Sequence, residues 1–114
     1  MKGTQIGEFE ELVLLIVAIL NEGAYGVAIR NELEIQSGRK ISIGAVHATT
    51  NRLEDKGFLE SKFGEVTLQR GGKRKKLYTV SSLGQRSMQE SKDLRNRLWE
   101  LIPQSSLFPK LSSK

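Results

Sequence analysis

Cysteine is absent from the 114-residue sequence, which also contains only one histidine and two prolines. Without cysteine the chain has no disulfide and no thiolate metal site, which is typical of proteins in a reducing compartment. The single histidine, His47, excludes a metal centre built from several histidines. No nucleophile–base constellation is visible either, so we expect no catalytic residues, no metal, no cofactor and no enzyme activity.

Long hydrophobic runs are also missing. The longest apolar run, Leu12 to Leu20, is too short to span a bilayer, which needs about 20 residues. The N-terminal residues lack the basic start and the small-residue cleavage pattern of a signal peptide. We therefore expect no membrane association and a cytoplasmic location. The hydrophobic content of 38% is lean for a single small domain, which favours a partner subunit.

The net charge of +5 is distributed unevenly along the chain. Residues 1–34 contain two basic and six acidic side chains, whereas residues 60–76 contain six basic and two acidic ones. One short segment thus carries most of the excess positive charge. Such a local excess favours contact with a polyanion over a general role in solubility.

Two helices are expected in the first third of the chain. The first, from about Gly7 to Leu20, has glutamates in its first turn, where they favour the positive end of the helix dipole. It is apolar nearly all round, which indicates contact with both its own domain and a second subunit. Gly23 is expected to end this segment. The second helix is expected from about Ala24 to Gln36.

The stretch Ser42–Gly57 predicts a third helix with two different faces, capped by Ser42 and stopped by Gly57. One face can pack on a core and carries Ile43, Val46, Thr50 and Leu53. The opposite face is small at first and hydrogen-bonding later, and carries Gly44, Ala45, Ala48, Asn51, Arg52 and Asp55. His47 and Thr49 are expected on the flanks of this outward face. Two helices joined by a short turn, the second with a bare outer face, indicate a helix-turn-helix.

Two strands are expected next, at Phe58–Phe63 and Leu77–Val80, with a long basic loop between them. The run Arg70–Lys76 puts five cations within seven residues. A hairpin with a basic loop directly after a helix-turn-helix is typical of a winged helix. The expected fold class is therefore mainly α (α+β), a winged helix-turn-helix with a C-terminal dimerisation helix.

The last helix is expected from about Ser82 to Ile102, with Ser81 as its N-cap and Pro103 at its end. It extends beyond a single winged-helix module, so its apolar seam requires another surface, such as a symmetric partner. Trp99 lies beside this seam, as an interface anchor or as part of a ligand pocket between subunits. We divide the chain into a winged-helix DNA-binding domain (1–81), a dimerisation helix (82–102) and a polar tail (103–114).

The expected ligand is double-stranded DNA, with two kinds of contact. The basic loop would contact phosphates or the minor groove, which provides affinity and register but little sequence information. The third helix would read bases, since Ala45 and Ala48 offer methyl groups to thymine and Asn51 matches adenine. Arg52 would reach a phosphate. The expected contact residues are Ser42, Gly44, Ala45, His47, Ala48, Thr49, Asn51, Arg52, Arg70, Lys73, Arg74 and Lys75.

Three blocks of the sequence resemble the PadR family of bacterial transcriptional regulators: YGVAIRNELE (Tyr25–Glu34), ISIGAVHATTNRLEDKGFLES (Ile41–Ser61) and RGGKRKKLYTVSSLG (Arg70–Gly84). The resemblance covers about Ile6 to Met88 and is greatest to short-chain members with a single helix after the wing. It implies a dimer built by the first and last helices, and usually repression at a palindromic operator. It also implies DNA contacts from the third helix and the wing.

The sequence departs from the family pattern at two positions, because the family commonly has tyrosine where His47 stands and leucine where Thr50 stands. The hydroxyl of Thr50 requires a hydrogen-bond partner on the core side of the third helix. Some relatives bind planar aromatic or drug-like effectors between subunits. A small-molecule effector is therefore a further candidate partner here, with Trp99 as the one residue that favours it.

The leading hypothesis is a homodimeric, sequence-specific DNA-binding transcriptional regulator, more in keeping with a repressor than an activator. An alternative from another class is a winged-helix protein–protein module whose basic wing binds an acidic partner. A palindrome upstream of its own gene or of a neighbouring operon would favour the regulator.

Overall fold

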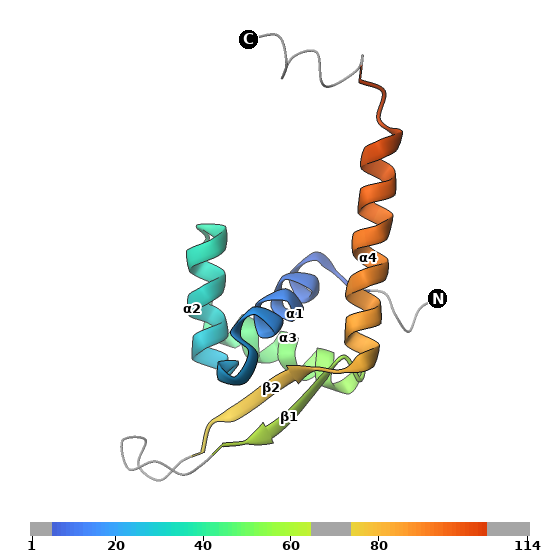
Figure 1. The fold of residues 1–114 in the computed structure, drawn as a ribbon. Coiled ribbons are helices and arrows are strands. Elements are labelled where there is room, and N and C mark those ends of the chain that lie inside the picture. Colours follow the sequence, from blue (N-terminus) through green and yellow to red (C-terminus); the bar gives the residue numbers. More distant parts are fainter. Residues whose placement is uncertain (1–5, 65–73, 105–114) are drawn as a thin grey trace.

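Figure 1 shows the computed structural model of the protein, which describes residues 6–64 and 74–104. Three helices come first, α1 (Glu8–Leu20), α2 (Gly26–Ser37) and α3 (Ile43–Asp55), with a short 3-10 turn, η2 (Asn21–Gly23), after α1. An antiparallel hairpin follows, made of β1 (Leu59–Phe63) and β2 (Lys76–Val80), and then α4 (Ser82–Leu101). The mainly helical winged-helix fold expected from the sequence is confirmed.

Local capping chemistry sets the bounds of the helices on both sides of the hairpin. The Ser42 hydroxyl accepts a hydrogen bond from the Ala45 N–H at 3.0 Å, and the Ser81 hydroxyl accepts one from the Gly84 N–H at 3.0 Å. Both serines are therefore N-caps, as expected. Gly57, after the end of α3, has φ +83°, a left-handed conformation that favours glycine.

The core lies where α1, α2, α3 and the hairpin meet. Its fully buried side chains include Val13 and Val17 from α1, Ile29 from α2, Val46 and Leu53 from α3, and Phe58. Thr50 is also buried in this core, and its hydroxyl donates a hydrogen bond to the His47 carbonyl oxygen at 3.1 Å. This bond satisfies the hydroxyl, so the core tolerates threonine where an apolar residue would pack.

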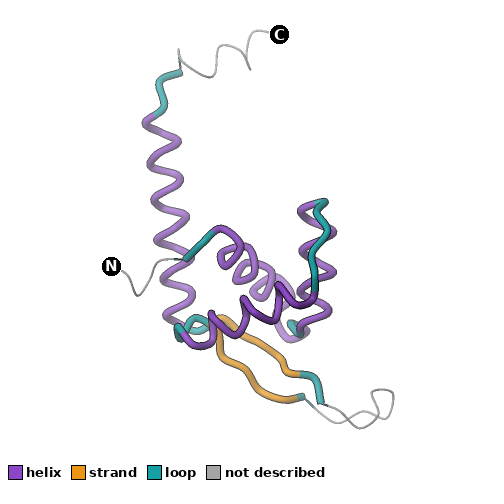
Figure 2. Tube along the Cα trace, turned by 180° about the vertical axis from the view of Figure 1, so that it is seen from behind, coloured by secondary structure: helices purple, strands orange, loops and turns teal. Residues whose placement is uncertain are grey.

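A backbone hydrogen bond attaches the hairpin to the helical part of the molecule. The register of the hairpin pairs Leu59 with Val80 at the base and Phe63 with Lys76 at the far end. The Tyr78 N–H donates to the Ala24 carbonyl oxygen at 2.8 Å, which joins β2 to the segment before α2. The hairpin therefore extends from the helical core in a defined direction, as Figures 1 and 2 show.

The helix α4 begins against the hairpin and then projects away from the rest of the molecule (Figures 1 and 2). At its start Gly84 is buried, and a Cβ atom there would overlap the Phe58 carbonyl oxygen, so only glycine fits. Further along, its apolar side chains are exposed, reaching 58% at Trp99 and 70% at Leu101. The expected apolar seam thus lies on an uncovered helix.

Some element boundaries differ from the sequence expectation. The second helix begins at Gly26, two residues later than expected, because the Ala24 backbone is not helical and its carbonyl binds β2. The first helix ends at Leu20, with Asn21 at φ +57° as its C-cap, and Gly23 falls within the 3-10 turn. Among the described residues, none of the helices is long and apolar enough to cross a membrane.

Candidate nucleic-acid interface

The outward face of α3 is exposed over its whole length. The residues on it that the sequence assigned to DNA are all exposed, namely Ser42, Gly44, Ala45, His47, Ala48, Asn51 and Arg52. Apart from its chain neighbours and the backbone of its own helix, no heavy atom lies within 4 Å of the place where a Gly44 Cβ would stand, so the backbone is bare there. This face can approach another surface closely at its N-terminal end and offers hydrogen-bonding groups toward its C-terminal end.

Thr49 does not belong to this face, and its assignment to the flank was wrong. Its exposed fraction is 2%, and its hydroxyl accepts a hydrogen bond from Arg52 Nη2 at 3.3 Å. Thr49 lies three residues after Val46 and four before Leu53, which places it on the buried stripe of the helix. Its side chain therefore supports the helix from within and is not available to a partner.

Arg52 has its own partner within the chain. Its Nε donates to a Glu10 carboxylate oxygen at 3.2 Å, and Lys56 Nζ lies 3.0 Å from both oxygens of the same carboxylate. Glu10 stands in the first turn of α1, and its carboxylate also accepts the Gly7 N–H at 2.9 Å. Burial acts to raise the pKa of Glu10, but these hydrogen bonds together outweigh it and hold that pKa below its ordinary value.

A groove of about 420 Å³ lies between the N-terminus of α2, the outward face of α3 and the start of β2. His47 and Asn51 line it from α3, and Arg74 and Lys75 line it from the wing. Tyr25 closes one side, with Lys75 Nζ 4.0 Å from the centre of its ring. The fold thus brings the described basic residues of the wing to the same groove as the helix expected to read bases.

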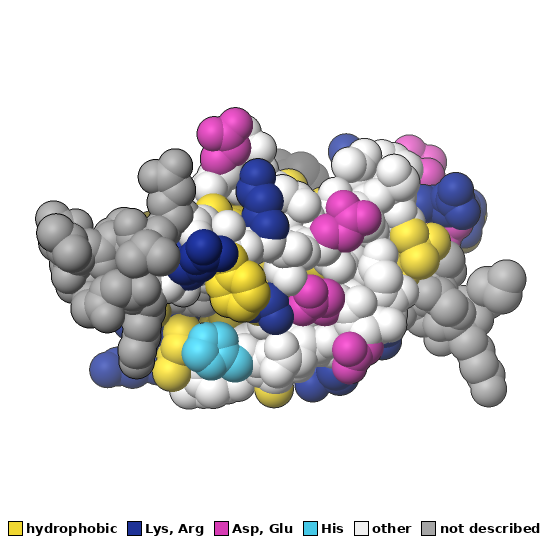
Figure 3. All heavy atoms as spheres, turned by 90° about the horizontal axis from the view of Figure 1, so that it is seen from below, with side chains coloured by type: hydrophobic (Ala, Val, Ile, Leu, Met, Phe, Trp, Pro, Cys, Tyr) yellow, Lys and Arg dark blue, Asp and Glu magenta, His cyan; other side chains and the backbone are white. Residues whose placement is uncertain are grey.

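Figure 3 shows the lower face of the molecule, on which basic and hydrophobic side chains lie next to the histidine. Arg74 is exposed and Lys75 is half-buried. Arg70 and Lys73, which the sequence also assigned to DNA, lie outside the described residues. Tyr25 was not among the expected contact residues, because the sequence placed it inside the second helix, whereas in the structure it stands directly before the start of α2.

A cluster around Glu54 connects α3 to both strands. The Ser61 hydroxyl donates to Glu54, and Lys76 Nζ lies 3.2 Å from Glu54 Oε1. The hydrogen bond from Ser61, followed by the interaction with Lys76, lowers the pKa of Glu54. The hydrogen bond to Glu54 in turn raises the pKa of Lys76. The wing therefore has a polar attachment to the C-terminal half of α3.

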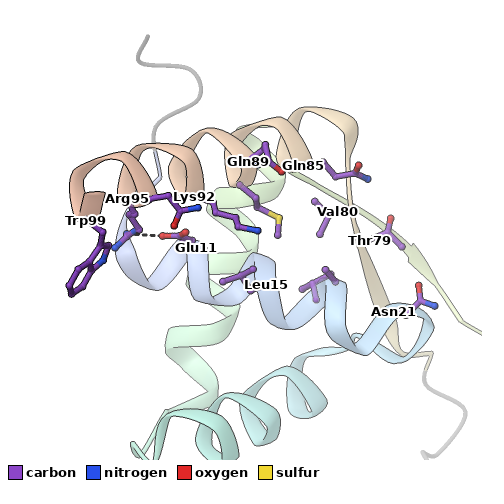
Figure 4. A pocket seen from close by; sticks show the side chains of 14 residues that line it. Glu11, Leu15, Asn21, Thr79, Val80, Gln85, Gln89, Lys92, Arg95 and Trp99 are labelled. Atoms are coloured by element: carbon purple, nitrogen blue, oxygen red, sulfur yellow. Dashed lines mark hydrogen bonds and ion pairs between the residues drawn. The ribbon is translucent and has the colours of Figure 1, made fainter. Parts of the chain in front are cut away.

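A second and larger cavity, of about 810 Å³, lies between α1, β2 and α4 on the other side of the hairpin base. Figure 4 shows Trp99, Arg95 and Glu11 at one end of it and Asn21 and Thr79 at the other. Glu11 and Arg95 join α1 to α4 through an ion pair of 2.7 Å. In residues 6–64 and 74–104, we find no group of three acidic, histidine or cysteine side chains that would hold a metal ion.

A family model and several solved structures match this chain. The model of the Transcriptional regulator PadR-like family matches residues 15–90, which is more than half of the chain. The comparison with curated proteins finds no match.

Among solved structures, a PadR family regulator from Eggerthella lenta is 26% identical, with a TM-score of 0.64 over 94% of this chain and 88% of that one. A PadR-like transcription factor from Bacteroides fragilis is 22% identical, with a TM-score of 0.69 over 81% and 84%. A PadR-like regulator from Bacillus cereus is 18% identical, with a TM-score of 0.68 over 93% of each chain. The protein therefore belongs to the PadR-like family of transcriptional regulators, which are not enzymes.

Proposed function

We propose that this transcriptional regulator is a sequence-specific repressor that binds a palindromic operator as a homodimer in the cytoplasm. The observation that carries the proposal is the groove in which His47 and Asn51 of α3 lie beside Arg74 and Lys75 of the wing. A base-reading helix and phosphate-binding cations within one groove are the two components that sequence-specific DNA binding requires.

In this proposal α3 enters the major groove with its N-terminal half. Gly44 lets the backbone come close, and the methyl groups of Ala45 and Ala48 meet thymine methyl groups. Asn51 pairs with adenine through two hydrogen bonds. Ser42 and His47 contact the sugar–phosphate backbone at the edge of the groove, where His47 is already exposed.

The wing supplies the contacts that do not depend on sequence. Arg70, Lys73, Arg74 and Lys75 bind phosphates or enter the minor groove beside the α3 site. The described pair, Arg74 and Lys75, lines the groove next to Asn51, which supports a single continuous DNA footprint. Removing these charges weakens binding to every sequence.

The proposal of a homodimer rests on apolar surface that one chain leaves uncovered. Leu15 and Ile19 of α1 are 40% and 63% exposed, and the side chains of Leu94, Leu98, Trp99 and Leu101 on α4 are exposed as well. A monomer rarely leaves so many large apolar side chains on neighbouring helices in water. A two-fold partner that covers them would also place two α3 helices on one palindromic site.

Trp99 and the cavity between α1 and α4 support a place for a planar small-molecule effector next to this interface. The indole is exposed at one end of the cavity (Figure 4). An effector that stacks on Trp99 would act on α4 and so on the spacing of the two DNA-reading helices. The same side chain serves as an interface anchor when no effector is bound.

Selection of duplexes from a random-sequence library by the purified full chain tests the proposal. We expect enrichment of one motif with two-fold symmetry, with half-sites about 10 base pairs or a multiple of that apart. Recovery of DNA without any shared motif would contradict sequence-specific repression. It would instead favour the alternative in which the basic wing binds acidic partners without sequence specificity.

A further inference from the structure

We propose that Glu10 is a positioning residue for DNA reading: it holds Arg52 and Lys56, and thereby fixes the rotation of α3 about its own axis. This inference rests on the proposed function. It assigns the half-exposed Arg52 side chain to an ion pair within the chain and not to a phosphate. The carboxylate that orients the DNA-reading helix thus comes from α1, a helix that lies outside the helix-turn-helix itself.

The position of the Glu10 carboxylate is fixed by its burial and by a hydrogen bond at the start of α1. Its exposed fraction is 6%, and Oε1 accepts the Gly7 N–H at 2.9 Å, which closes the first turn of α1. The next turns of α1 bury Val13, Leu14 and Val17 in the core. The carboxylate therefore has a fixed position relative to the domain and can serve as a reference point for another helix.

Two cations four residues apart meet this carboxylate, Arg52 in the last turn of α3 and Lys56 at the C-cap of that helix. Arg52 Nε lies 3.2 Å from Glu10 Oε2, and Lys56 Nζ lies 3.0 Å from both oxygens. Arg52 also donates through Nη2 to the buried Thr49 hydroxyl. The arginine is thus fastened through two of its nitrogen atoms, one to α1 and one to its own helix.

The ion pairs with Glu10 fix the rotation of α3 about its own axis, which the apolar core defines less closely. Val46, Thr50 and Leu53 keep α3 on the core, but apolar packing alone permits a small rotation of a helix about its axis. Successive residues on a helix point about 100° apart, so the direction of Arg52 determines that of Asn51. Holding Arg52 against Glu10 therefore aims Asn51 away from the core and toward the groove.

The test compares specific with non-specific binding, because a rotated helix loses base contacts but keeps its charges. The variant Glu10→Gln retains the shape and an oxygen for the Gly7 N–H, but removes the charge that attracts both cations. We measure its affinity for a duplex selected by the wild-type chain and for a scrambled duplex of the same length and composition. We expect the ratio of the two affinities to fall about tenfold, the size of one lost side-chain–base pair.

The affinity of Glu10→Gln for the scrambled duplex should stay equal or rise, since the variant gains one unit of positive charge. A matched control is Glu8→Gln, two residues earlier in the same turn. Glu8 is exposed, and it forms a longer ion pair with Arg39, at 3.8 Å. This control makes the same charge change without touching α3, so its affinity ratio should stay at the wild-type value.

The variant Arg52→Gln tests the pair from the other side. If Arg52 is held by Glu10 and does not contact DNA, the slope of log K against log salt on the scrambled duplex stays the same. If Arg52 of each subunit of the dimer binds a phosphate, the steepness of that slope decreases by about 1.8, or 0.9 for each phosphate. A less steep salt dependence in Arg52→Gln than in wild type would overturn the inference. An unchanged affinity ratio in Glu10→Gln would also overturn it.

Equal loss of both affinities in Glu10→Gln would also overturn the inference, since it would indicate a role in stability alone. Wild-type protein that selects no duplex would instead defeat the proposed function. Circular dichroism of each variant at the assay temperature confirms that the measured chains are folded.

Discussion

The His47 imidazole packs against the bare backbone of Gly26, where a Cβ atom would lie 2.9 Å from His47 Nε2. Gly26 is the first residue of α2, and its φ is not in the left-handed region, so alanine is compatible with its backbone. Glycine at position 26 therefore leaves room for His47, which lies on the outward face of α3. One glycine thus sets where the histidine stands in the candidate DNA groove.

Gly26→Ala should displace His47 while leaving the fold intact. The histidine is at the end of a side chain that can rotate, and alanine is a better helix former than glycine by about 1 kcal/mol. We expect an unchanged or higher melting temperature together with several-fold weaker binding to the selected duplex. A double-mutant cycle with His47→Ala checks the cause, because the two changes should not be additive. Additive effects would contradict this packing relationship.

Asn51→Ala should change which sequence the protein prefers. The side chain is exposed on α3 and lines the groove beside the wing, where it can reach a base edge. Losing a bidentate contact to adenine removes about 1–3 kcal/mol of discrimination at one position of each half-site. Repeated selection with the variant measures this directly. If the variant selects the same motif with the same information at each position, Asn51 does not read a base.

The double variant Arg74→Ala/Lys75→Ala should weaken binding to all duplexes alike. These side chains line the α3 groove from the wing and carry charge but no base-specific geometry. Affinities for the selected and the scrambled duplex should fall by the same factor, so that their ratio is unchanged. Fluorescence anisotropy with both duplexes checks this. A change in preference, without general weakening, would show that the division of roles between wing and helix is wrong.

The stability of the protein should fall in acid because of Glu10 and Glu54. The pKa of each is lower in the folded protein than its ordinary value. Their contribution is therefore complete above the unfolded pKa of glutamate and is lost as pH falls through the folded pKa. The free energy of unfolding, measured in urea, should fall between neutral and acidic pH by about 1 kcal/mol less in Glu10→Gln than in wild type. An equal difference in both proteins would contradict this role.

Leu98→Glu should separate the subunits of the proposed dimer. Leu98 is 52% exposed on α4, between the exposed side chains of Leu94 and Leu101. A carboxylate there would cost little in a monomer, but it would be buried without a partner in a symmetric interface. Light scattering should give a dimer for wild type and a monomer for the variant, with helical content retained. A folded wild-type monomer at micromolar concentration would exclude the dimer.

The parts of this structure that depend on local chemistry were predictable from the sequence. Ser42 and Ser81 cap helices through hydrogen bonds that span only three residues, so their neighbours sufficed to identify them. Thr49 was misplaced because it stands at the edge between the two faces of α3, where helical periodicity alone does not decide burial. Its buried hydroxyl is explained only by the Arg52 guanidinium next to it.

The contacts of Glu10 were beyond any local pattern. The sequence indicated only that a glutamate in the first turn suits the helix dipole. Its partners Arg52 and Lys56 follow 42 and 46 residues later, and only the packing of α1 on α3 brings them together. Likewise, the meeting of Tyr25 with Lys75 depends on the hydrogen bond between β2 and Ala24, which no periodicity encodes.

The most direct test of the central claim is a salt titration of wild-type binding to the duplex that the protein itself selects. If α3 and the basic wing bind DNA together, log K falls linearly with log salt, by about 0.9 for each phosphate neutralised. Arg74 and Lys75 from two subunits alone should produce a slope steeper than about −3. A flat plot, with affinity unchanged between low and high salt, would contradict the account.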